Sequence, residues 1–270
     1  MKLPAGKKIV IIGCGNVAWH LAKHFQSLNA YSLFVYNHKA NPALNDFRLK
    51  LKCKTAVGLE HVITNADYYF ICVSDQFIAE TAKQLDIKNP GAILLHTSGS
   101  AKIEELGHNI YGTAVFYPLQ TFSKKDVVNW KEIPLIVEAQ NAGVKKNVTA
   151  LAKQFSKHVT VLAYKERLKL HLAAVLVNNF SNALYVAAAQ LAGTKHSGRH
   201  TIEMLLPLIK QTTLKLEKLS PLEAQTGPAK RHDEVVLKKH SRLLSDQPGL
   251  KKIYKQLSKL IVQQQKEKHA

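Results

Sequence analysis

The stretch KKIVIIGCGNVA, residues 7–18, decides the fold of this chain. The apolar run over residues 7–12 predicts a buried strand, and the spacing G-x-G-x-x-A follows it directly. Residues 19–25 then place Leu21, Ala22 and Phe25 at helical spacing. Strand, glycine turn and helix in this order are typical of a site that binds a dinucleotide. The alternative is a glycine turn at an unrelated junction of strand and helix.

Each small residue of the turn has a physical role in that interpretation. Gly13 permits the tight turn, Gly15 leaves room for a pyrophosphate beside the backbone, and Ala18 lets the helix pack close to the strand. The free N–H groups and the positive end of the helix dipole then face the phosphates. The predicted cofactor contacts in this segment are Gly13, Cys14, Gly15, Asn16, Val17 and Ala18.

The end of the second predicted strand, residues 31–36, suggests which dinucleotide is bound. Asn37, His38 and Lys39 stand there, roughly twenty residues past the turn, where a site for NAD carries an acidic residue that holds the ribose hydroxyls. None of these three residues is acidic. Their side chains can form hydrogen bonds with a 2′-phosphate and neutralise its charge. We therefore expect NADP rather than NAD. An ordinary polar loop at a strand end is the alternative.

The alternation of strands and helices continues through the first half of the chain. It predicts an α/β fold, in which a Rossmann domain with a doubly wound parallel sheet spans residues 1–163. Ligands of such sheets lie beyond the carboxyl ends of the strands, so the strand ends should converge on one crevice. The other residues expected there are Val73 and Ser74 for the cofactor, and Ser98 and Gly99 for the substrate.

The second half of the chain contains no convincing strand, and residues 164–270 are predicted to form an all-α C-terminal domain. Its first helix, residues 166–191, is apolar nearly all round and is expected to be buried on most of its surface. Further amphipathic helices are expected over residues 201–219, 229–244 and 249–265.

Composition excludes several classes of protein. Of the 270 residues, 46% are hydrophobic, which suffices for a sizeable core. The three cysteines form no C-x-x-C pair, so neither a disulfide framework nor a metal site is expected. No unbroken apolar run reaches the roughly 18 residues that span a bilayer, and no signal segment precedes the first strand. We expect a cytoplasmic protein that does not enter a membrane.

The net charge of +19 is spread over both halves of the chain. A protein that binds nucleic acid usually concentrates its charge in a patch or a tail. The lysines here lie on the polar faces of predicted helices, so a basic solvated surface is expected and nucleic acid is an unlikely partner. An anionic substrate or a phosphorylated cofactor is compatible with this charge.

The long apolar helix carries polar side chains on one stripe. At about 100° per residue, His171, Asn178 and Asn182 fall within about 40° of one another. Polar groups on a buried helix need partners, which are either other protein groups or a substrate. A histidine can move a proton near neutral pH, and the asparagines can hold a carboxylate or a carbonyl. A core histidine satisfied by its neighbours is the alternative for His171.

These features together resemble the β-hydroxyacid dehydrogenase and pyrroline carboxylate reductase superfamily, with deazaflavin-dependent NADP oxidoreductase as a relative. The resemblance is greatest to bacterial Rossmann-like proteins whose C-terminal domain has no known function. It implies hydride transfer at a nicotinamide, a substrate crevice between the two domains, and a homodimer built through the helical domain. The segments that carry it are residues 13–18, 96–100, 117–122, 171–179 and 226–233.

Two positions depart from the pattern of these families. The dehydrogenases carry a lysine followed four residues later by an asparagine on the long helix, where this chain has His171 and Val175. Tyr117 stands where a histidine is expected in the bacterial group. A proton donor is therefore either His171 or a residue elsewhere.

The segment from Thr226 to Asp233 contains Gly227-Pro228, which interrupts helical structure. A new helix is expected to begin at Ala229. Arg231 would lie near its start as a clamp for an anionic substrate. Ordinary loop and cap chemistry, with Asp233 at the helix N-terminus, is the alternative.

The sequence thus predicts an NADP-dependent oxidoreductase that transfers hydride to or from a small carbonyl, hydroxy-acid or imine compound. In this hypothesis His171 is the general acid and base, and Asn178 orients the substrate. Ser98 and Gly99 contact the polar end of the substrate. A nucleotide-binding or sensing protein without turnover is the alternative, and the missing lysine favours it. A basic nucleic-acid binder is a third hypothesis.

Overall fold

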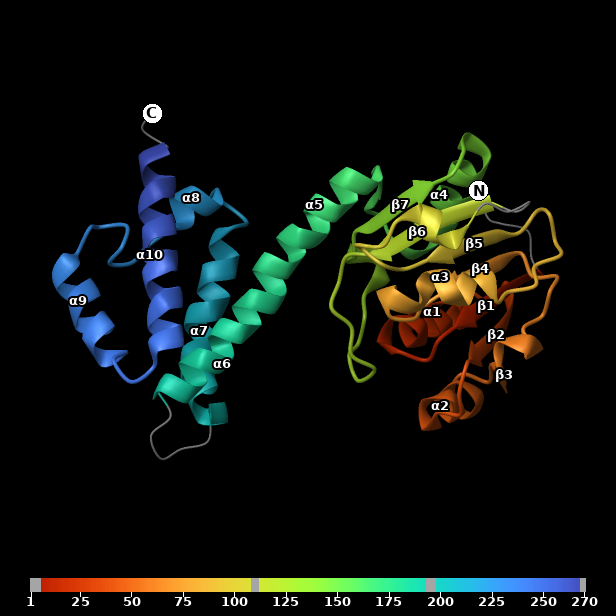
Figure 1. Cartoon of the computed structure of the whole chain (residues 1–270), viewed down its shortest axis with the longest axis horizontal. Helices are drawn as coiled ribbons and strands as arrows, with labels where there is room; N and C mark the ends of the chain where they lie inside the picture. The colour runs from red at the N-terminus through yellow and green to blue at the C-terminus, as the bar shows by residue number, and fades with distance from the viewer. Residues whose placement is uncertain (1–5, 108–111, 193–197, 268–270) are drawn as a thin grey trace. The chain divides into compact units, whose positions relative to one another are not determined.

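The computed structural model describes residues 6–107, 112–192 and 198–267 of the chain (Figure 1). The chain divides into two compact units, Met1–Asn178 and Asn179–Ala270. The first unit contains a sheet with helices on both faces. The second contains helices, without a strand among its described residues.

The first unit is built on an eight-stranded sheet with the order β3-β2-β1-β4-β5-β6-β7-β8. All neighbouring strands are parallel except β6 and β7, which are antiparallel. The prediction of a doubly wound, mostly parallel sheet is confirmed, and the order reverses between β1 and β4. The strands are β1 Lys7–Ile12, β2 Tyr31–Asn37, β3 Lys54–Val57, β4 Tyr68–Ile71, β5 Ile93–His96, β6 Gly112–Pro118, β7 Leu135–Ala139 and β8 Val159–Val161.

The central strands are apolar on both faces because helices cover both sides of the sheet. In β1, Ile9 and Ile11 face one core cluster, whereas Val10 and Ile12 face another. Four rings of the first cluster pack edge to face at 4.9–5.5 Å between centroids: Phe25, Phe70, Phe116 and Phe155. Full burial of each such side chain contributes roughly 1.5–3 kcal/mol. The helices of this unit are α1 Asn16–Ser27, α2 Pro42–Lys50, α3 Ile78–Lys83, α4 Ala142–Phe155 and α5 Tyr164–Ala174.

Helix α2 occupies residues for which the sequence predicted no element, and strand β3 follows it at Lys54–Val57. The side chain of Asn41 accepts a hydrogen bond from the N–H of Ala43 at 2.9 Å, and Pro42 begins the helix. An asparagine N-cap followed by proline is a strong start signal that outweighs the weak apolar pattern of the following residues.

The second unit contains α6 Ser181–Ala192, α7 Gly198–Lys215, α8 Pro221–Ala224, α9 Glu234–Leu243 and α10 Pro248–Glu267. The expectation that a helix opens at Ala229 is wrong, because α9 begins five residues later. The Asp233 carboxylate caps it by accepting a hydrogen bond from the N–H of Val236 at 3.1 Å. Arg231 therefore lies in the turn before the helix, exposed.

The predicted long helix is continuous from Tyr164 to Ala192, but a π-helical turn, Val175–Phe180, separates α5 from α6. The expectation that this helix is buried on most of its surface is wrong for the single chain. Val177 is 75% exposed and Phe180 is 54% exposed. Apolar composition predicts that a surface will be covered, but it does not say that the same chain covers it.

The same helix has the length and composition that a membrane span requires. An 18-residue stretch within it has a mean hydropathy of 1.4, and none of that stretch is buried. The stretch contains no unbroken apolar run of that length, because a few polar residues interrupt it. A single helix of this kind is weak evidence for a membrane. Its first turns also pack on the sheet, where the fully buried Arg167 anchors them.

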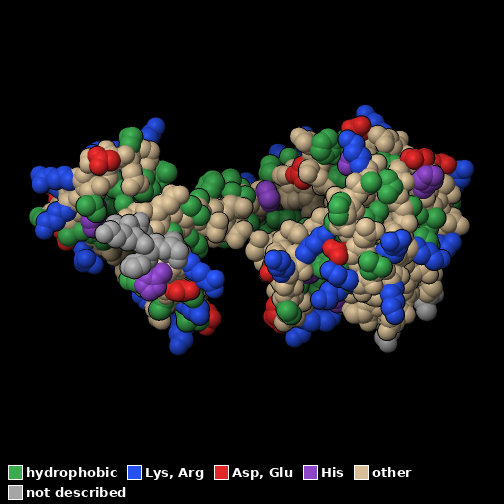
Figure 2. Space-filling model, turned by 90° about the horizontal axis from the view of Figure 1, so that it is seen from below, with side chains coloured by type: hydrophobic (Ala, Val, Ile, Leu, Met, Phe, Trp, Pro, Cys, Tyr) green, Lys and Arg blue, Asp and Glu red, His purple; other side chains and the backbone are tan. Residues whose placement is uncertain are grey.

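The basic side chains agree with a solvated surface. Figure 2 shows Lys and Arg spread over both units on the face that it presents, without one dominant patch.

Candidate functional site

The glycine turn after β1 is shaped by its backbone. Gly13 has a φ of +108°, a conformation that other residues rarely adopt, and a Cβ there would collide with the carbonyl oxygen of Cys72. The N–H of Gly13 donates to the carbonyl oxygen of Tyr36 at 2.8 Å. The turn is thus held between the ends of β2 and β4, on the carboxyl edge of the sheet.

The start of α1 is open for an anion. Its N-cap, Gly15, supplies no side-chain hydrogen bond, and a Cβ at Gly15 would meet nothing within 4 Å. The N–H groups of Asn16, Val17 and Ala18 lack helical acceptors because they form the first turn. That turn carries no acidic residue. Unpaired N–H groups beside open space suit the phosphates of a dinucleotide.

The three residues predicted to select NADP differ in their surroundings. Asn37 is buried, and its Nδ2 donates to the carbonyl oxygen of Lys39 at 2.7 Å, so its side chain fixes the loop. His38 and Lys39 are exposed, and neither forms an ion pair or a side-chain hydrogen bond among the described residues. Two basic side chains therefore remain available at the end of β2.

The end of β4 leads into the second part of the site. Val73 is half-buried against one core cluster, and the exposed Ser74 precedes a 3₁₀ turn, Asp75–Phe77. The carboxylate of Asp75 accepts a hydrogen bond from Ser98 Oγ at 2.7 Å and another from Ser100 Oγ. Asp75 therefore joins the end of β4 to the loop after β5.

Ser98 and Gly99, predicted to contact substrate, both have protein contacts. Ser98 Oγ also accepts hydrogen bonds from the N–H groups of Ser100 and Ala101, at 3.0 and 2.9 Å. Its hydroxyl thus shapes the loop itself. Gly99 is buried beneath two side chains, and a Cβ there would lie 2.5 Å from His171 Nδ1 and 2.7 Å from Tyr117 Cζ.

His171 and Tyr117 form a hydrogen-bonded pair over Gly99. The phenol oxygen of Tyr117 lies 3.1 Å from His171 Nδ1, and the ring centroids are 5.8 Å apart. Burial raises the pKa of Tyr117, so its phenol stays protonated at neutral pH. His171 Nε2 has no hydrogen-bond partner in the described part of the chain. The sequence placed no role on Tyr117, yet it is the direct partner of His171.

Arg167 holds this arrangement together, and the sequence did not single it out. Its guanidinium is fully buried. Nη1 donates to the carbonyl oxygens of Ser98 and Gly99 at 3.1 and 2.9 Å, and Nη2 to that of Ala101 at 2.8 Å. Nε and Nη2 both donate to Glu138 Oε2, at 3.0 and 2.9 Å. Arg167 is therefore internally satisfied and cannot clamp an anionic substrate.

His96 lies fully buried at the end of β5. Its Nδ1 accepts a hydrogen bond from the N–H of Ser98 at 3.2 Å. Burial, reinforced by the charge of Arg167, lowers the pKa of His96 to about 4. The imidazole is thus neutral at physiological pH.

The three polar residues of the predicted helix stripe are not all brought together. Across Val175–Phe180 the helix is π-helical, so the constant angle of about 100° per residue does not hold there. Asn178 is exposed in that turn, and Asn182 and Arg231 are exposed in the second unit. His171 alone lies in the site over Gly99. The roles of the other three stay predictions.

The cysteines carry no catalytic signature. Burial raises the pKa of Cys53 to about 11 and that of Cys72 to about 12, and Cys14 is shifted upward for the same reason. All three are free thiols. Within the described ranges, no group of three potential ligands is placed to hold a metal ion.

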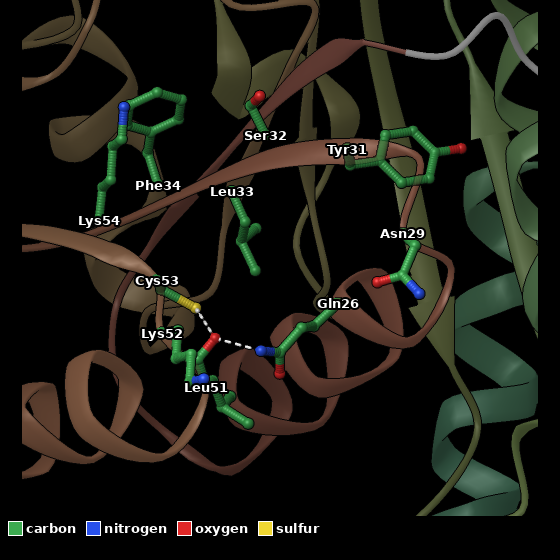
Figure 3. A pocket seen from close by; sticks show the side chains of 10 residues that line it. All are labelled: Gln26, Asn29, Tyr31, Ser32, Leu33, Phe34, Leu51, Lys52, Cys53 and Lys54. Atoms are coloured by element: carbon green, nitrogen blue, oxygen red, sulfur yellow. Dashed lines mark hydrogen bonds between the residues drawn. The ribbon is translucent and has the colours of Figure 1, made fainter.

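Two surface cavities lie away from these residues. One, of about 310 Å³, is lined by residues near the starts of β2 and β3, among them Gln26, Cys53 and Lys54 (Figure 3). There Gln26 Nε2 donates to the carbonyl oxygen of Leu51 at 2.5 Å, and Lys54 Nζ lies 5.3 Å from the Phe34 ring centroid. The other, of about 400 Å³, lies beside the start of β5. Both are at the amino edge of the parallel strands, opposite the glycine turn.

Comparison with known proteins identifies both parts of the chain. Residues 8–98 match the family described as NADP oxidoreductase coenzyme F420-dependent, and residues 133–261 match a domain of unknown function (DUF2520). No protein with a curated functional description matches the sequence.

Solved structures share the fold over nearly the whole chain. A "putative NADP oxidoreductase" from Bacteroides fragilis is 33% identical, with a TM-score of 0.86 over 96% of this chain and 98% of that one. A reductive aminase from Aspergillus terreus, in complex with NADPH and ethyl-5-oxohexanoate, is 14% identical, with a TM-score of 0.64 over 97% and 95%. A pyrroline-5-carboxylate reductase from Coxiella burnetii is 14% identical, with a TM-score of 0.55 over 96% and 97%. The two distant likenesses show the fold alone.

Proposed function

The chain belongs to the NADP oxidoreductase family that its Bacteroides relative and the match over residues 8–98 identify, and from this premise we propose its reaction. The chain transfers hydride between NADP(H) and a small carbonyl, hydroxy-acid or imine compound. The observation that carries the proposal is the Tyr117–His171 pair over Gly99, at the sheet edge that also carries the glycine turn.

The residues around the glycine turn suit the cofactor. The N–H groups at the start of α1 receive its phosphates, and the absence of a side chain at Gly15 leaves space for them. His38 and Lys39 carry the preference for NADP over NAD, because they present unpaired basic groups to a 2′-phosphate. Val73 and Ser74 continue this surface along the end of β4. When bound, NADP(H) supplies the hydride chemistry.

His171 is the proposed proton donor and acceptor. When the protonated phenol of Tyr117 donates to Nδ1, the imidazole carries its own proton on Nε2. That nitrogen has no other partner among the described residues, so it is available to a carbonyl oxygen or an imine nitrogen. Tyr117 thus fixes the tautomer that the reduction needs. This arrangement replaces the lysine that the dehydrogenases carry.

The remaining predicted residues enter the proposal as substrate contacts. Asn178 orients the substrate, Asn182 is a further substrate contact, and Arg231 is the clamp for an anionic substrate. For Ser98 the contact is indirect, because its hydroxyl is committed to Asp75 and to the loop. Gly99 contributes by the absence of a side chain.

The experiment combines binding and turnover. Calorimetric titration with NADPH and NADH comes first, and oxidation of NADPH with a panel of small ketones, aldehydes and cyclic imines follows. His171→Ala should lower turnover by about 10²–10⁴-fold and leave the Kd for NADPH within about twofold of the wild type. His61→Ala is the matched control, because that histidine is exposed in the 3₁₀ turn Leu59–His61, which follows β3. In the sheet order β3 lies four places from β5, the strand that leads to Gly99.

Three outcomes decide between the hypotheses. Binding of NADPH without turnover of any compound by the wild type favours the non-catalytic binding or sensing protein. Binding of neither nucleotide removes the oxidoreductase proposal. Equal turnover by His171→Ala and the wild type removes His171 from the mechanism.

A homodimer through the helical unit and a cytoplasmic location are further parts of the proposal. The exposed apolar side chains of the helical unit's first helix, including Phe180, Leu184 and Val186, support the dimer. A partner that covers them would remove apolar surface from water. Sedimentation of the purified chain in detergent-free buffer tests this, and a monomer at micromolar concentration would contradict it.

A further inference from the structure

The connection between β6 and β7 passes beside α1 (Figure 1). His20, buried on α1, lies with its Nε2 2.7 Å from the carbonyl oxygen of Ser123. The Phe122 ring packs 5.3 Å from the His20 ring and 5.6 Å from that of Trp130. Asp126 closes a turn, accepting from the N–H of Ser123 at 3.0 Å. The connection is therefore fixed against α1 at this point.

This fixed turn places Lys124 between α1 and α2. Its Nζ lies 5.7 Å from the Trp19 ring centroid and 5.6 Å from the Phe47 ring centroid. The two rings pack edge to face at 5.2 Å, so they form a rigid support under the half-buried lysine. Attraction to aromatic faces holds an ammonium weakly, by roughly 0.5–1 kcal/mol at exposed sites.

The charge of Lys124 reaches the glycine turn. It lowers the pKa of Cys14, against the larger upward shift that burial causes. Trp19, beneath the ammonium, lies in the first turns of the helix whose N-terminus is open. Lys124 forms no ion pair or hydrogen bond among the described residues. Its charge acts on the carboxylate of Asp46, but that carboxylate forms an ion pair with Lys50 at 2.9 Å.

From these contacts we propose that Lys124 binds a phosphate group of the dinucleotide. Lys124 lacks an acidic partner, is held by a fixed turn and lies over Trp19, a residue of the first turn of α1. A cation in this position is suited to an anion that also contacts the unpaired N–H groups of that turn. The inference rests on the proposed function, since it names a further residue of the same cofactor site. The ligand chemistry is a phosphate, either in the pyrophosphate or at the 2′ position.

The test is calorimetric titration of NADPH and NADH into the wild type, Lys124→Met, Lys124→Arg and Lys125→Met. Lys124→Met keeps an apolar chain on the two rings and removes the charge, whereas Lys124→Arg keeps the charge. Lys125→Met is the matched control, because that neighbouring lysine is exposed. The thermal unfolding midpoint of each variant is measured alongside.

We expect Lys124→Met to weaken NADPH binding about tenfold and to reduce its salt dependence, with Lys124→Arg and Lys125→Met near the wild type. Equal weakening for NADH assigns the contact to the pyrophosphate, and weakening for NADPH alone assigns it to the 2′-phosphate. An unchanged Kd in Lys124→Met overturns the inference and leaves the proposed function standing. Weakening in both Lys124 variants with a lowered midpoint also overturns it, because it indicates a structural role. Absence of binding to the wild type overturns both proposals.

Discussion

Arg167 and Glu138 form a buried ion pair that ties helix α5 to strand β7. Two guanidinium nitrogens donate to the same carboxylate oxygen, at 3.0 and 2.9 Å. The remaining donors reach carbonyl oxygens of the loop that contains Gly99. His171 lies four residues further along α5. The side chain of Arg167 therefore holds in place both the helix that carries His171 and the loop beneath its imidazole. The proposed site thus depends on a residue that no substrate would touch.

Arg167→Lys should destabilise the first unit by about 3 kcal/mol, although the charge is kept. A lysine has three donors on a flexible chain and cannot replace a planar group that makes five hydrogen bonds, and Glu138 would keep a poorly paired charge. Urea unfolding followed by circular dichroism measures the change. Lys165→Arg, at an exposed position on the same helix, is the control and should stay within about 0.5 kcal/mol. A loss below about 1 kcal/mol in Arg167→Lys would show that the network is replaceable.

The glycine turn was predictable and the Arg167 network was not, for a physical reason. The turn is encoded locally: strand, glycines and helix stand within one short segment, and each residue type follows from backbone geometry. The partners of Arg167 lie 29 and 66–69 positions away in the sequence. Before the strand order is known, an arginine near the start of a helix resembles any solvated one.

The long helix illustrates the opposite error. Its composition predicted burial, and its polar side chains predicted one functional stripe. The π-helical turn changes the angle between His171 and Asn178, and periodicity carries no signal for such a turn. Tyr117 was discounted because it departs from a family pattern. Its contact with His171 becomes visible only when β6 and α5 are placed together.

Gly99→Ala should damage catalysis more than cofactor binding. The added methyl would lie 2.5 Å from His171 Nδ1 and 2.7 Å from Tyr117 Cζ, so the pair must shift. We expect about 10²-fold lower turnover, an unchanged Kd for NADPH, and a loss of about 1–3 kcal/mol in stability from overpacking. Steady-state kinetics, calorimetry and urea unfolding measure the three. Gly249→Ala is the control, since a Cβ there meets nothing within 4 Å. Wild-type turnover in Gly99→Ala would mean that the pair does not move protons.

The two glycines of the turn should separate folding from binding. Gly13→Ala should cost about 2 kcal/mol or more in stability, because its φ is +108° and the methyl collides with the carbonyl oxygen of Cys72. Gly15→Ala should change stability by about 0.5 kcal/mol at most, since φ there is −74° and the space is open. It should weaken NADPH binding about tenfold, because the methyl occupies space proposed for a phosphate. Equal NADPH affinity in Gly15→Ala and the wild type would contradict that placement.

Stability should fall in acid because of His96. Its pKa is about 4 in the folded chain against 6.5 when unfolded, so between these values the unfolded state binds the extra proton. The free energy of unfolding therefore decreases as pH falls from 6.5 toward 4, by about 1.4 kcal/mol per pH unit from this residue. In His96→Asn, which keeps an acceptor near the N–H of Ser98, this contribution is absent. Urea unfolding from pH 7.5 to 4.5 measures the difference in unfolding free energy between wild type and variant. This difference should be constant above pH 6.5 and should shrink below it. A pH-independent difference would mean that His96 ionises alike in both states.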